Sequence, residues 1–182
     1  MPVYGYAIVG IAWWLWVIPF FLAQKQKQTA NVVDHRARWG IMLMAISYSL
    51  LWQGHFWLRP LPDWRLALGV LLFTLANLLS WSGARALGKQ WRFDAGLTSD
   101  HELVRSGPYR FVRHPIYASM FCILLGTGFI MTSKWLLIAA VVVFLAGAEI
   151  RVRVEDKLLG SHFGEEFQNY QRSVSAYIPF VR

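Results

Sequence analysis

Long apolar runs separated by short polar stretches dominate this chain. The first three runs are long enough to cross the apolar core of a bilayer, which needs about 20 helical residues. The last two are shorter and are joined only by Thr132 to Lys134, so they predict a tight helical hairpin. The pattern therefore predicts an all-α integral membrane protein with five transmembrane helices. The expected helical segments are Val3–Ala23, Gly40–Leu58, Trp64–Leu87, Ile116–Met131 and Trp135–Ile150.

Lysine and arginine are distributed unevenly between the two sides of these five segments. Arg59, Arg65 and Lys134 lie on one side, and all the other members of the 18 Lys and Arg residues lie on the opposite side. Cytoplasmic connections of membrane proteins carry an excess of positive charge. We therefore expect a multi-pass protein with its N-terminus outside and its C-terminus in the cytoplasm, and both long polar stretches, Gly88–Pro115 and Asp156–Arg182, on the cytoplasmic side.

The composition supports the membrane assignment and limits the other possibilities. Apolar residues make up 56% of the 182 residues, mean hydropathy is +0.38, and there are 10 tryptophans. Tryptophan favours the membrane interface, so those of the first segment are expected to anchor its helix. The alternative is that they shape a path by which a lipid enters. The net charge of +8 is spread over the connections rather than clustered, so no nucleic-acid partner is expected. The single cysteine, Cys122, has no internal partner, and the five histidines show no metal-site spacing.

The dipeptide His114-Pro115 marks the start of the fourth helix. Proline suits the first helical position and disfavours helical backbone in the residue before it. The helix should therefore begin at Pro115, and its free backbone N–H groups offer a place for an anionic group such as a carboxylate. In the simpler alternative, Arg113 and His114 only anchor this helix end at the membrane surface.

The end of the fifth apolar segment carries two pairs of opposite charges. Glu149 and Arg153 are four residues apart, as are Arg151 and Glu155, so each pair lies on one helix face. The two faces are roughly opposite, so one pair can face the helical bundle while the other faces water or lipid headgroups. An inward-facing pair would be a candidate functional site. The alternative is two solvated ion pairs that contribute little.

Two stretches together resemble one family. The segment His101–Tyr117 and the acidic pair Glu155-Asp156 are similar to the motif of the isoprenylcysteine carboxyl methyltransferases and the related phospholipid methyltransferases. That motif has a Gly-Pro-Tyr turn, then Arg-His-Pro-x-Tyr-x-Gly, and later Glu-Glu. Here Ser119 stands at the last glycine and Asp156 at the second glutamate. The tail from Phe163 to Pro179 also matches, and the resemblance covers roughly residues 85 to 182.

The resemblance implies methyl transfer from S-adenosyl-L-methionine to a lipophilic acceptor. The length and the apolar segments predict a single membrane domain, 1–182, in which residues 1–87 form three N-terminal helices. The resemblance implies that residues 88–182 form the cofactor-binding catalytic region, with a cytoplasmic pocket and a C-terminal interfacial segment. Arg151 and Glu155 are the implied catalytic residues, with Arg151 facing the acceptor and Glu155 the cofactor. The implied cofactor-binding residues are His101, Leu103, Val104, Gly107, Pro108, Tyr109, Arg113, His114, Tyr117 and Glu155.

The nature of the acceptor is open to chemical argument. A carboxylate is ionised at neutral pH and needs orientation rather than a base, and arginine can orient it in bidentate geometry. Arg151 therefore favours a reaction most like isoprenylcysteine carboxyl O-methylation, on a lipophilic small molecule or lipidated acceptor drawn from the bilayer, with membrane lipids as further partners. The alternatives are a phospholipid (phosphatidylethanolamine-type) N-methyltransferase, an NADPH-dependent sterol-type reductase, and a protein that kept the fold without the chemistry.

Overall fold

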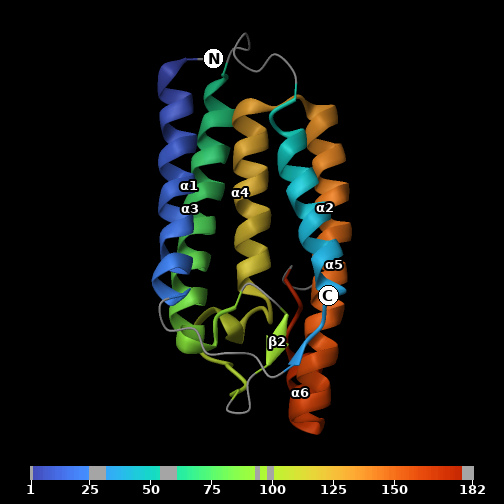
Figure 1. The fold of residues 1–182 in the computed structure, drawn as a ribbon. Coiled ribbons are helices and arrows are strands. Elements are labelled where there is room, and N and C mark those ends of the chain that lie inside the picture. The colour runs from blue at the N-terminus through green and yellow to red at the C-terminus, as the bar shows by residue number, and fades with distance from the viewer. Residues whose placement is uncertain (1, 25–31, 54–60, 93–94, 98–100, 178–182) are drawn as a thin grey trace.

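The structure is a bundle of long helices with the short elements gathered at one end (Figure 1). It is a computed structural model that describes residues 2–24, 32–53, 61–92, 95–97 and 101–177. The end that carries the short elements is called the polar end below. The long helices are α1 (Val3–Gln24), α2 (Ala37–Leu50), α3 (Asp63–Leu87), α4 (Pro115–Met131) and α5 (Lys134–Phe163). The short elements are β1 (Val32–Val33), η2 (Gly88–Gln90), β2 (Gly96–Leu97), η3 (Gly107–Arg110) and α6 (Glu165–Ser173).

The strand pair is the departure from an all-helical chain in the described residues. Strands β1 and β2 pair antiparallel, with Val32 opposite Leu97 and Val33 opposite Gly96. Strand β1 lies just before α2 and strand β2 lies after α3, so the pair links the two polar connections at this end of the bundle. The apolar pattern did not indicate it because two residues are too short to show a strand periodicity.

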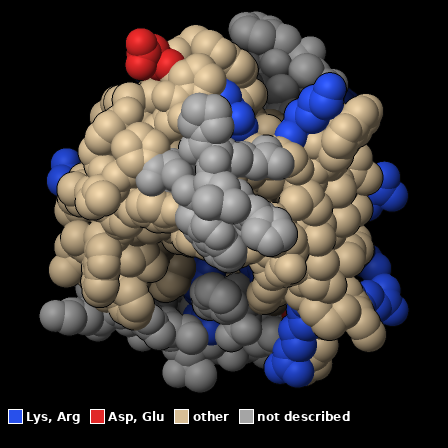
Figure 2. Space-filling view, turned by 90° about the horizontal axis from the view of Figure 1, so that it is seen from above, with Lys and Arg blue, Asp and Glu red and all other residues tan. Residues whose placement is uncertain are grey.

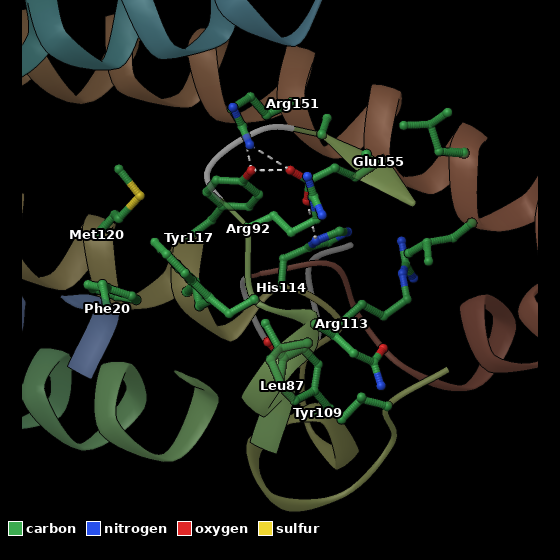
Figure 3. Close-up of a pocket in the computed structure, with 18 of the residues that line it drawn as sticks. Phe20, Leu87, Arg92, Tyr109, Arg113, His114, Tyr117, Met120, Arg151 and Glu155 are labelled. Atoms are coloured by element: carbon green, nitrogen blue, oxygen red, sulfur yellow. Dashed lines mark hydrogen bonds and ion pairs between the residues drawn. The ribbon is translucent and has the colours of Figure 1, made fainter. Parts of the chain in front are cut away.

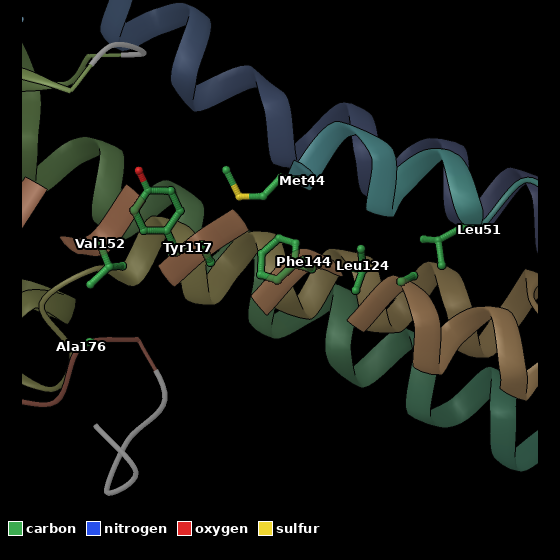
Figure 4. Packing of buried hydrophobic residues seen from close by; sticks show 9 residues of the cluster. Met44, Leu51, Tyr117, Leu124, Phe144, Val152 and Ala176 are labelled. Atoms are coloured by element: carbon green, nitrogen blue, oxygen red, sulfur yellow. The ribbon is translucent and has the colours of Figure 1, made fainter. Parts of the chain in front are cut away.

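The helices pack in two sets that α4 and α5 join. Helix α3 packs against α1 and α4, whereas α2 packs along α5. At the second contact, a Cβ atom added to Gly147 would lie 2.7 Å from the carbonyl oxygen of Gly40. Such close backbone approach needs small residues, as is common where membrane helices pack. Above it, Met44, Phe144 and Leu124 build the apolar core between α2, α5 and α4 (Figure 4).

The predicted helical hairpin is confirmed. Helix α4 begins at Pro115, as its sequence predicts, and ends at Met131. Helix α5 begins at Lys134, after Ser133, whose hydroxyl accepts a hydrogen bond from the backbone N–H of Leu136 at 3.4 Å. A serine before the first helical residue satisfies one of the unpaired N–H groups of the helix start.

Helix α5 is far longer than its apolar segment. The expected segment ends at Ile150, but the helix continues through the charged residues to Phe163 and has 30 residues. Charged residues with four-residue spacing support a helix as well as apolar ones do. The helix stops at Gly164, which has a φ of +55°, a conformation that glycine adopts without strain. The chain then turns into α6, which lies in the expected C-terminal segment.

Three of the helices are long and apolar enough to cross a membrane, at Val3–Ala23, Asp63–Gln90 and Lys134–Phe163. Helix α4 is apolar but has 17 residues, and α2 has 14. The second segment was expected to reach Leu58, but α2 ends at Leu50, and residues 54–60 lie outside the described part. Just after this end, the carbonyl of Leu51 accepts a hydrogen bond from the Thr132 hydroxyl at 2.7 Å. The count of five spans stays a prediction.

Seen from the end opposite the polar end, the bundle shows mostly uncharged residues, and Lys and Arg lie mainly towards its edges (Figure 2). Large apolar side chains are also exposed along the helices, among them Trp14, Leu78 and Val142. Exposed apolar surface of this extent is expected of helices that face lipid.

Candidate active site

A cavity of about 590 Å³ lies between the polar end and the helices above it. Its lining residues divide into two kinds, which come from different elements (Figure 3). One half, called the polar half below, carries charged residues from α5, from the stretch before α4 and from the connection after α3. The other half, called the apolar arm, lies between α1, α2 and α4. The polar half includes Arg92, Arg113, His114, Arg151 and Glu155, and the apolar arm includes Trp13, Trp16, Phe20, Met44, Tyr48 and Met120.

A closed triangle of hydrogen bonds lies where the two halves meet (Figure 3). Arg151 Nε donates to the Tyr117 hydroxyl at 2.5 Å, and that hydroxyl donates to Glu155 Oε1 at 2.5 Å. Arg151 Nη2 also donates to Glu155 Oε1 at 2.9 Å. The Arg151 side chain is only 5% exposed. The arginine predicted to face the acceptor and the glutamate predicted to face the cofactor are therefore direct neighbours, with Tyr117 between them.

His114 lies between two carboxylates. Its Nδ1 is 3.4 Å from Glu155 Oε2, and its Nε2 is 2.9 Å from Asp156 Oδ1. A neutral imidazole has one N–H, so only the protonated ring can donate to both carboxylates. Burial lowers the pKa of His114, but the hydrogen bonds to Asp156 and Glu155 outweigh burial and raise that pKa above its ordinary value. The ring thus lies where its protonated form would link the two acids of α5.

Asp156 connects this site to the C-terminal segment. Its Oδ2 accepts from Arg113 Nη2 at 2.9 Å and from Gln171 Nε2 at 3.1 Å. Arg113 Nη1 also donates to the carbonyls of Gln171 and Val174, at 3.0 and 2.5 Å. Asp156 was not among the predicted site residues. Although it is shorter than glutamate, it reaches both Arg113 and His114, so the shorter acid keeps a place in the network.

Backbone hydrogen bonds also connect the C-terminal segment to the stretch before α4. The N–H groups of Arg113 and His114 donate to the carbonyls of Ser175 and Ala176, at 2.8 and 2.7 Å. The Tyr170 hydroxyl donates to the carbonyl of Tyr109 at 2.6 Å. The tail and the motif before α4, which the sequence analysis grouped only by resemblance, therefore form one wall of the cavity.

The structure brings most of the predicted site residues to the cavity. His101, Leu103, Val104, Tyr109, Arg113, His114, Tyr117, Arg151 and Glu155 line it. Gly107 and Pro108 are not lining residues of this cavity. They open η3, where Gly107 has a φ of +60°, and the turn brings Tyr109 to the wall. Glycine suits this turn, since a left-handed residue is tolerated best as glycine. Cofactor binding by Gly107 and Pro108 stays a prediction.

His101 sits at the rim of the polar half. Its buried Nδ1 has no hydrogen-bond partner within the described residues. Burial, together with the nearby His162 and Arg92, lowers the pKa of His101. A neutral imidazole with an unsatisfied ring nitrogen beside a cavity is suited to a hydrogen bond with a ligand.

Helix α1 contributes side chains to the cavity, whereas its sequence favoured anchoring over a role in a lipid path. The tryptophans of this helix were expected to anchor it, but Trp13 and Trp16 face the cavity, while Trp14 is 71% exposed. Trp16 Nε1 donates to the Ser119 hydroxyl at 3.1 Å, so the serine that replaces the motif's glycine holds this ring. The signal was present, since Trp13, Trp16 and Phe20 follow the spacing of one helix face.

Comparisons with known proteins agree with this geometry. Residues 64–166 match the family described as phospholipid methyltransferase. A protein-S-isoprenylcysteine O-methyltransferase of Tribolium castaneum is 28% identical over 162 residues, which cover 86% of this chain and 57% of that protein. The cobalt-zinc-cadmium resistance protein CzcN of Cupriavidus metallidurans is 30% identical over 146 residues, covering 78% of this chain and 62% of that one.

A solved structure has the same fold over most of the chain. It is that of the eukaryotic intramembrane Ras methyltransferase, isoprenylcysteine carboxyl methyltransferase. The two superimpose with a TM-score of 0.62 at 25% sequence identity, over 82% of this chain and 55% of the other. The chain thus spans less than two thirds of the length of each of these relatives.

Proposed function

Since the chain belongs to the phospholipid methyltransferase family, we propose that it transfers a methyl group from S-adenosyl-L-methionine to a lipophilic acceptor. The observation that carries this proposal is the cavity, in which a network of buried charges adjoins an apolar arm. A polar cofactor and an apolar acceptor can meet at the boundary between the two halves, beside Arg151 and Tyr117.

The residues of the polar half suit this cofactor. The cavity of about 590 Å³ falls within the range of roughly 300–1,000 Å³ that is typical of cofactor pockets. Glu155 would balance the positive charge of the cofactor, and the N-terminus of α4 would favour its carboxylate. His101 offers an unsatisfied ring nitrogen for a further hydrogen bond. When bound, the cofactor supplies a methyl group that is already activated on a sulfonium.

The hydrogen bonds of Glu155 and Asp156 also affect which kind of acceptor the site can use. Glu155 already accepts hydrogen bonds from Tyr117 and Arg151 and faces the ring of His114. Asp156 accepts from Arg113, His114 and Gln171. Neither carboxylate is therefore placed as a general base, and a protonated amine would need one before attack. An acceptor that is already ionised fits better.

We therefore infer that the acceptor is a carboxylate, as in isoprenylcysteine carboxyl O-methylation. Arg151 would orient it, because a guanidinium binds a carboxylate in a defined geometry. Tyr117 holds Arg151 and Glu155 in place, and the tail excludes water from the polar half. Methyl transfer depends on such alignment and on the exclusion of water. The alternative is phospholipid N-methylation, which the family name keeps open.

The placement in the membrane follows from the charges. The polar end carries the positively charged connections, so we place it on the cytoplasmic side, with the N-terminus outside. Residues 1–87 would then provide the membrane frame and residues 88–182 the catalytic region, which shares a single domain with it. The acceptor would come from the bilayer.

Calorimetry on the purified protein tests the proposal. Binding of S-adenosyl-L-methionine and of NADPH should be measured side by side. We expect the first to bind and the second not to bind. Binding of NADPH alone would identify a reductase, and binding of neither would show that the chain keeps the fold without the chemistry.

A further inference from the structure

The apolar arm ends at a pair of aromatic rings, Trp13 of α1 and Tyr48 of α2, which we call the aromatic bridge. The two ring centroids are 5.2 Å apart and the planes meet at 71°. This edge-to-face geometry is favourable for aromatic side chains. The bridge joins two helices that lie on either side of the arm.

Both rings are held in place by α4. Trp13 Nε1 donates to the Thr127 hydroxyl at 3.0 Å, and the Tyr48 hydroxyl donates to the carbonyl of Met120 at 2.7 Å. Turning either ring away would leave a polar group without a partner inside apolar surroundings, which is costly. The bridge is therefore a fixed feature of the arm.

The bridge is the part of the arm furthest from the charged network. Helix α1 runs towards the polar end and α2 runs away from it, so Trp13 and Tyr48 are the most distant lining residues of their helices (Figure 1). Gly40 of α2 lies level with Arg151, because a Cβ atom at Gly40 would be 2.6 Å from Arg151 Cγ. The eight residues from Gly40 to Tyr48 span roughly 12 Å along the helix axis.

The apolar arm is also open to the surface of the protein. Phe21 and Ala45 line the cavity and are also exposed, so the arm reaches the surface between α1 and α2. An apolar group on the acceptor can therefore lie along the arm below the bridge or leave sideways. The first path buries it against Trp16, Met44 and Met120, which line the arm.

We infer that the aromatic bridge is a specificity determinant that limits how long an apolar group the arm can hold. This inference rests on the proposed function, since it takes the arm as the acceptor's site. It assigns to this protein carboxylate acceptors with a short apolar chain, and it predicts that longer chains gain nothing from their added length.

A homologous series of S-alkyl-N-acetylcysteines tests the inference. Each member has one carboxylate and one straight alkyl chain, and the series should be read both as binding affinity and as methyl ester formation. Affinity should rise by up to about fourfold per methylene for the short, water-soluble members and then stop rising. In Trp13→Ala the limit should move to longer chains. Trp14→Ala is the matched control, because Trp14 is exposed and does not line the cavity.

A second pair of variants guards against misfolding. Tyr48→Leu and Trp13→Leu keep apolar bulk in the core but break the bridge. Each should also increase the longest alkyl chain that still gains affinity, while S-adenosyl-L-methionine still binds. The inference is overturned if the variants show the limit of the wild type, or if the wild type has no limit.

The two readouts separate the inference from the proposed function. If the longest chain that still gains affinity is longer in Trp13→Ala than in the wild type, the bridge is supported even when no ester forms. The absence of ester would then contradict carboxyl methylation. If ester forms with the same dependence on chain length in the wild type and in Trp13→Ala, the reaction is supported and the bridge does not determine chain length.

Discussion

Helix α5 carries two arginine–glutamate pairs with the same four-residue spacing, and the two pairs lie in different surroundings. On the outer face, Arg153 Nε is 2.7 Å from Glu149 Oε1, and the arginine side chain is 70% exposed. On the inner face, Arg151 Nη2 is 2.9 Å from Glu155 Oε1, and the arginine side chain is 5% exposed. The spacing is thus the same, and the burial of the arginine distinguishes the pairs, since Glu149 and Glu155 are similarly exposed at 23% and 24%.

The comparison shows how the burial of the arginine changes what an ion pair contributes to the protein. An exposed pair is screened by water and contributes about 0–1 kcal/mol to stability. The inner pair also engages Tyr117 and, through Glu155, His114, so removing one member leaves other buried charges uncompensated. Such losses typically cost about 3–5 kcal/mol. The inner face of α5 should therefore be sensitive to substitution and the outer face tolerant.

The largest effect is expected from Glu155→Gln. The variant leaves Arg151 and His114 without their shared carboxylate, so the free energy of unfolding should fall by about 3–5 kcal/mol. The affinity for S-adenosyl-L-methionine, measured by calorimetry, should fall at least about 100-fold, on the order of 3 kcal/mol. Arg153→Gln on the outer face is the control, because this side chain is 70% exposed, and it should change either quantity by less than about 1 kcal/mol. Equal losses of stability and of cofactor affinity in both variants would show that the two faces of α5 do not differ in sensitivity.

Arg151→Lys should affect turnover more than cofactor binding. Lysine keeps the charge but loses the planar guanidinium that contacts both Tyr117 and Glu155. We expect kcat/KM for the acceptor to fall roughly 100-fold, about 2.7 kcal/mol, with cofactor affinity changed little. Arg153→Lys, on the exposed face, should leave both values near those of the wild type. Unchanged turnover in Arg151→Lys would exclude Arg151 from orienting the acceptor.

Gly147→Ala tests the same inner face one turn before Arg151. The added Cβ would lie 2.7 Å from the carbonyl oxygen of Gly40, so α2 must move away from α5. Overpacking of this kind costs about 1–3 kcal/mol, measurable as a loss of unfolding free energy in detergent. Gly10→Ala is the control, because no atom lies within 4 Å of the new Cβ, and it should be neutral or stabilise α1 by up to about 1 kcal/mol.

The smallest expected effect is a dependence of stability on pH that His114 creates. Its pKa is raised in the folded protein by Asp156 and Glu155, against the opposing effect of burial. The stabilisation is therefore fully present below pH about 6.5, the unfolded value, and is lost as pH rises through the raised folded pKa. Thermal unfolding of the wild type should show this decline above pH about 6.5. His114→Asn should flatten it, whereas a change at the exposed His35 should not; a decline that persists in His114→Asn would point to another group.

Local signals predicted some features of the site well. Pro115 predicted the start of α4, because proline favours the first helical position whatever surrounds it. The spacing of Arg151, Arg153 and their glutamates predicted two charged faces on one helix. The motif from His101 to Tyr117 predicted most of the cavity wall on one side. Each of these follows from residues close in sequence.

Other features depend on residues far apart in the chain. Asp156 contacts Arg113 and His114 because the tail folds back onto the stretch before α4. The roles of Trp13 and Tyr48 depend on how α1 and α2 are placed around α4. The carbonyl of Leu51, just after the end of α2, accepts a hydrogen bond from the distant Thr132. None of these contacts has a signature within a single helix.

The sequence by itself therefore determined which segments are apolar helices, where the helical hairpin turns and which charges share a face, because helix formation and burial in lipid depend on short-range periodicity. Only the tertiary structure decided that Arg151 faces inward while Arg153 faces outward, that His114 lies between two acids, and that the rings of Trp13 and Tyr48 meet. The physical reason is that burial and hydrogen-bond partners belong to positions in space. Two arginines with the same spacing from a glutamate, such as Arg151 and Arg153, acquire different energies once the neighbouring helices are in place.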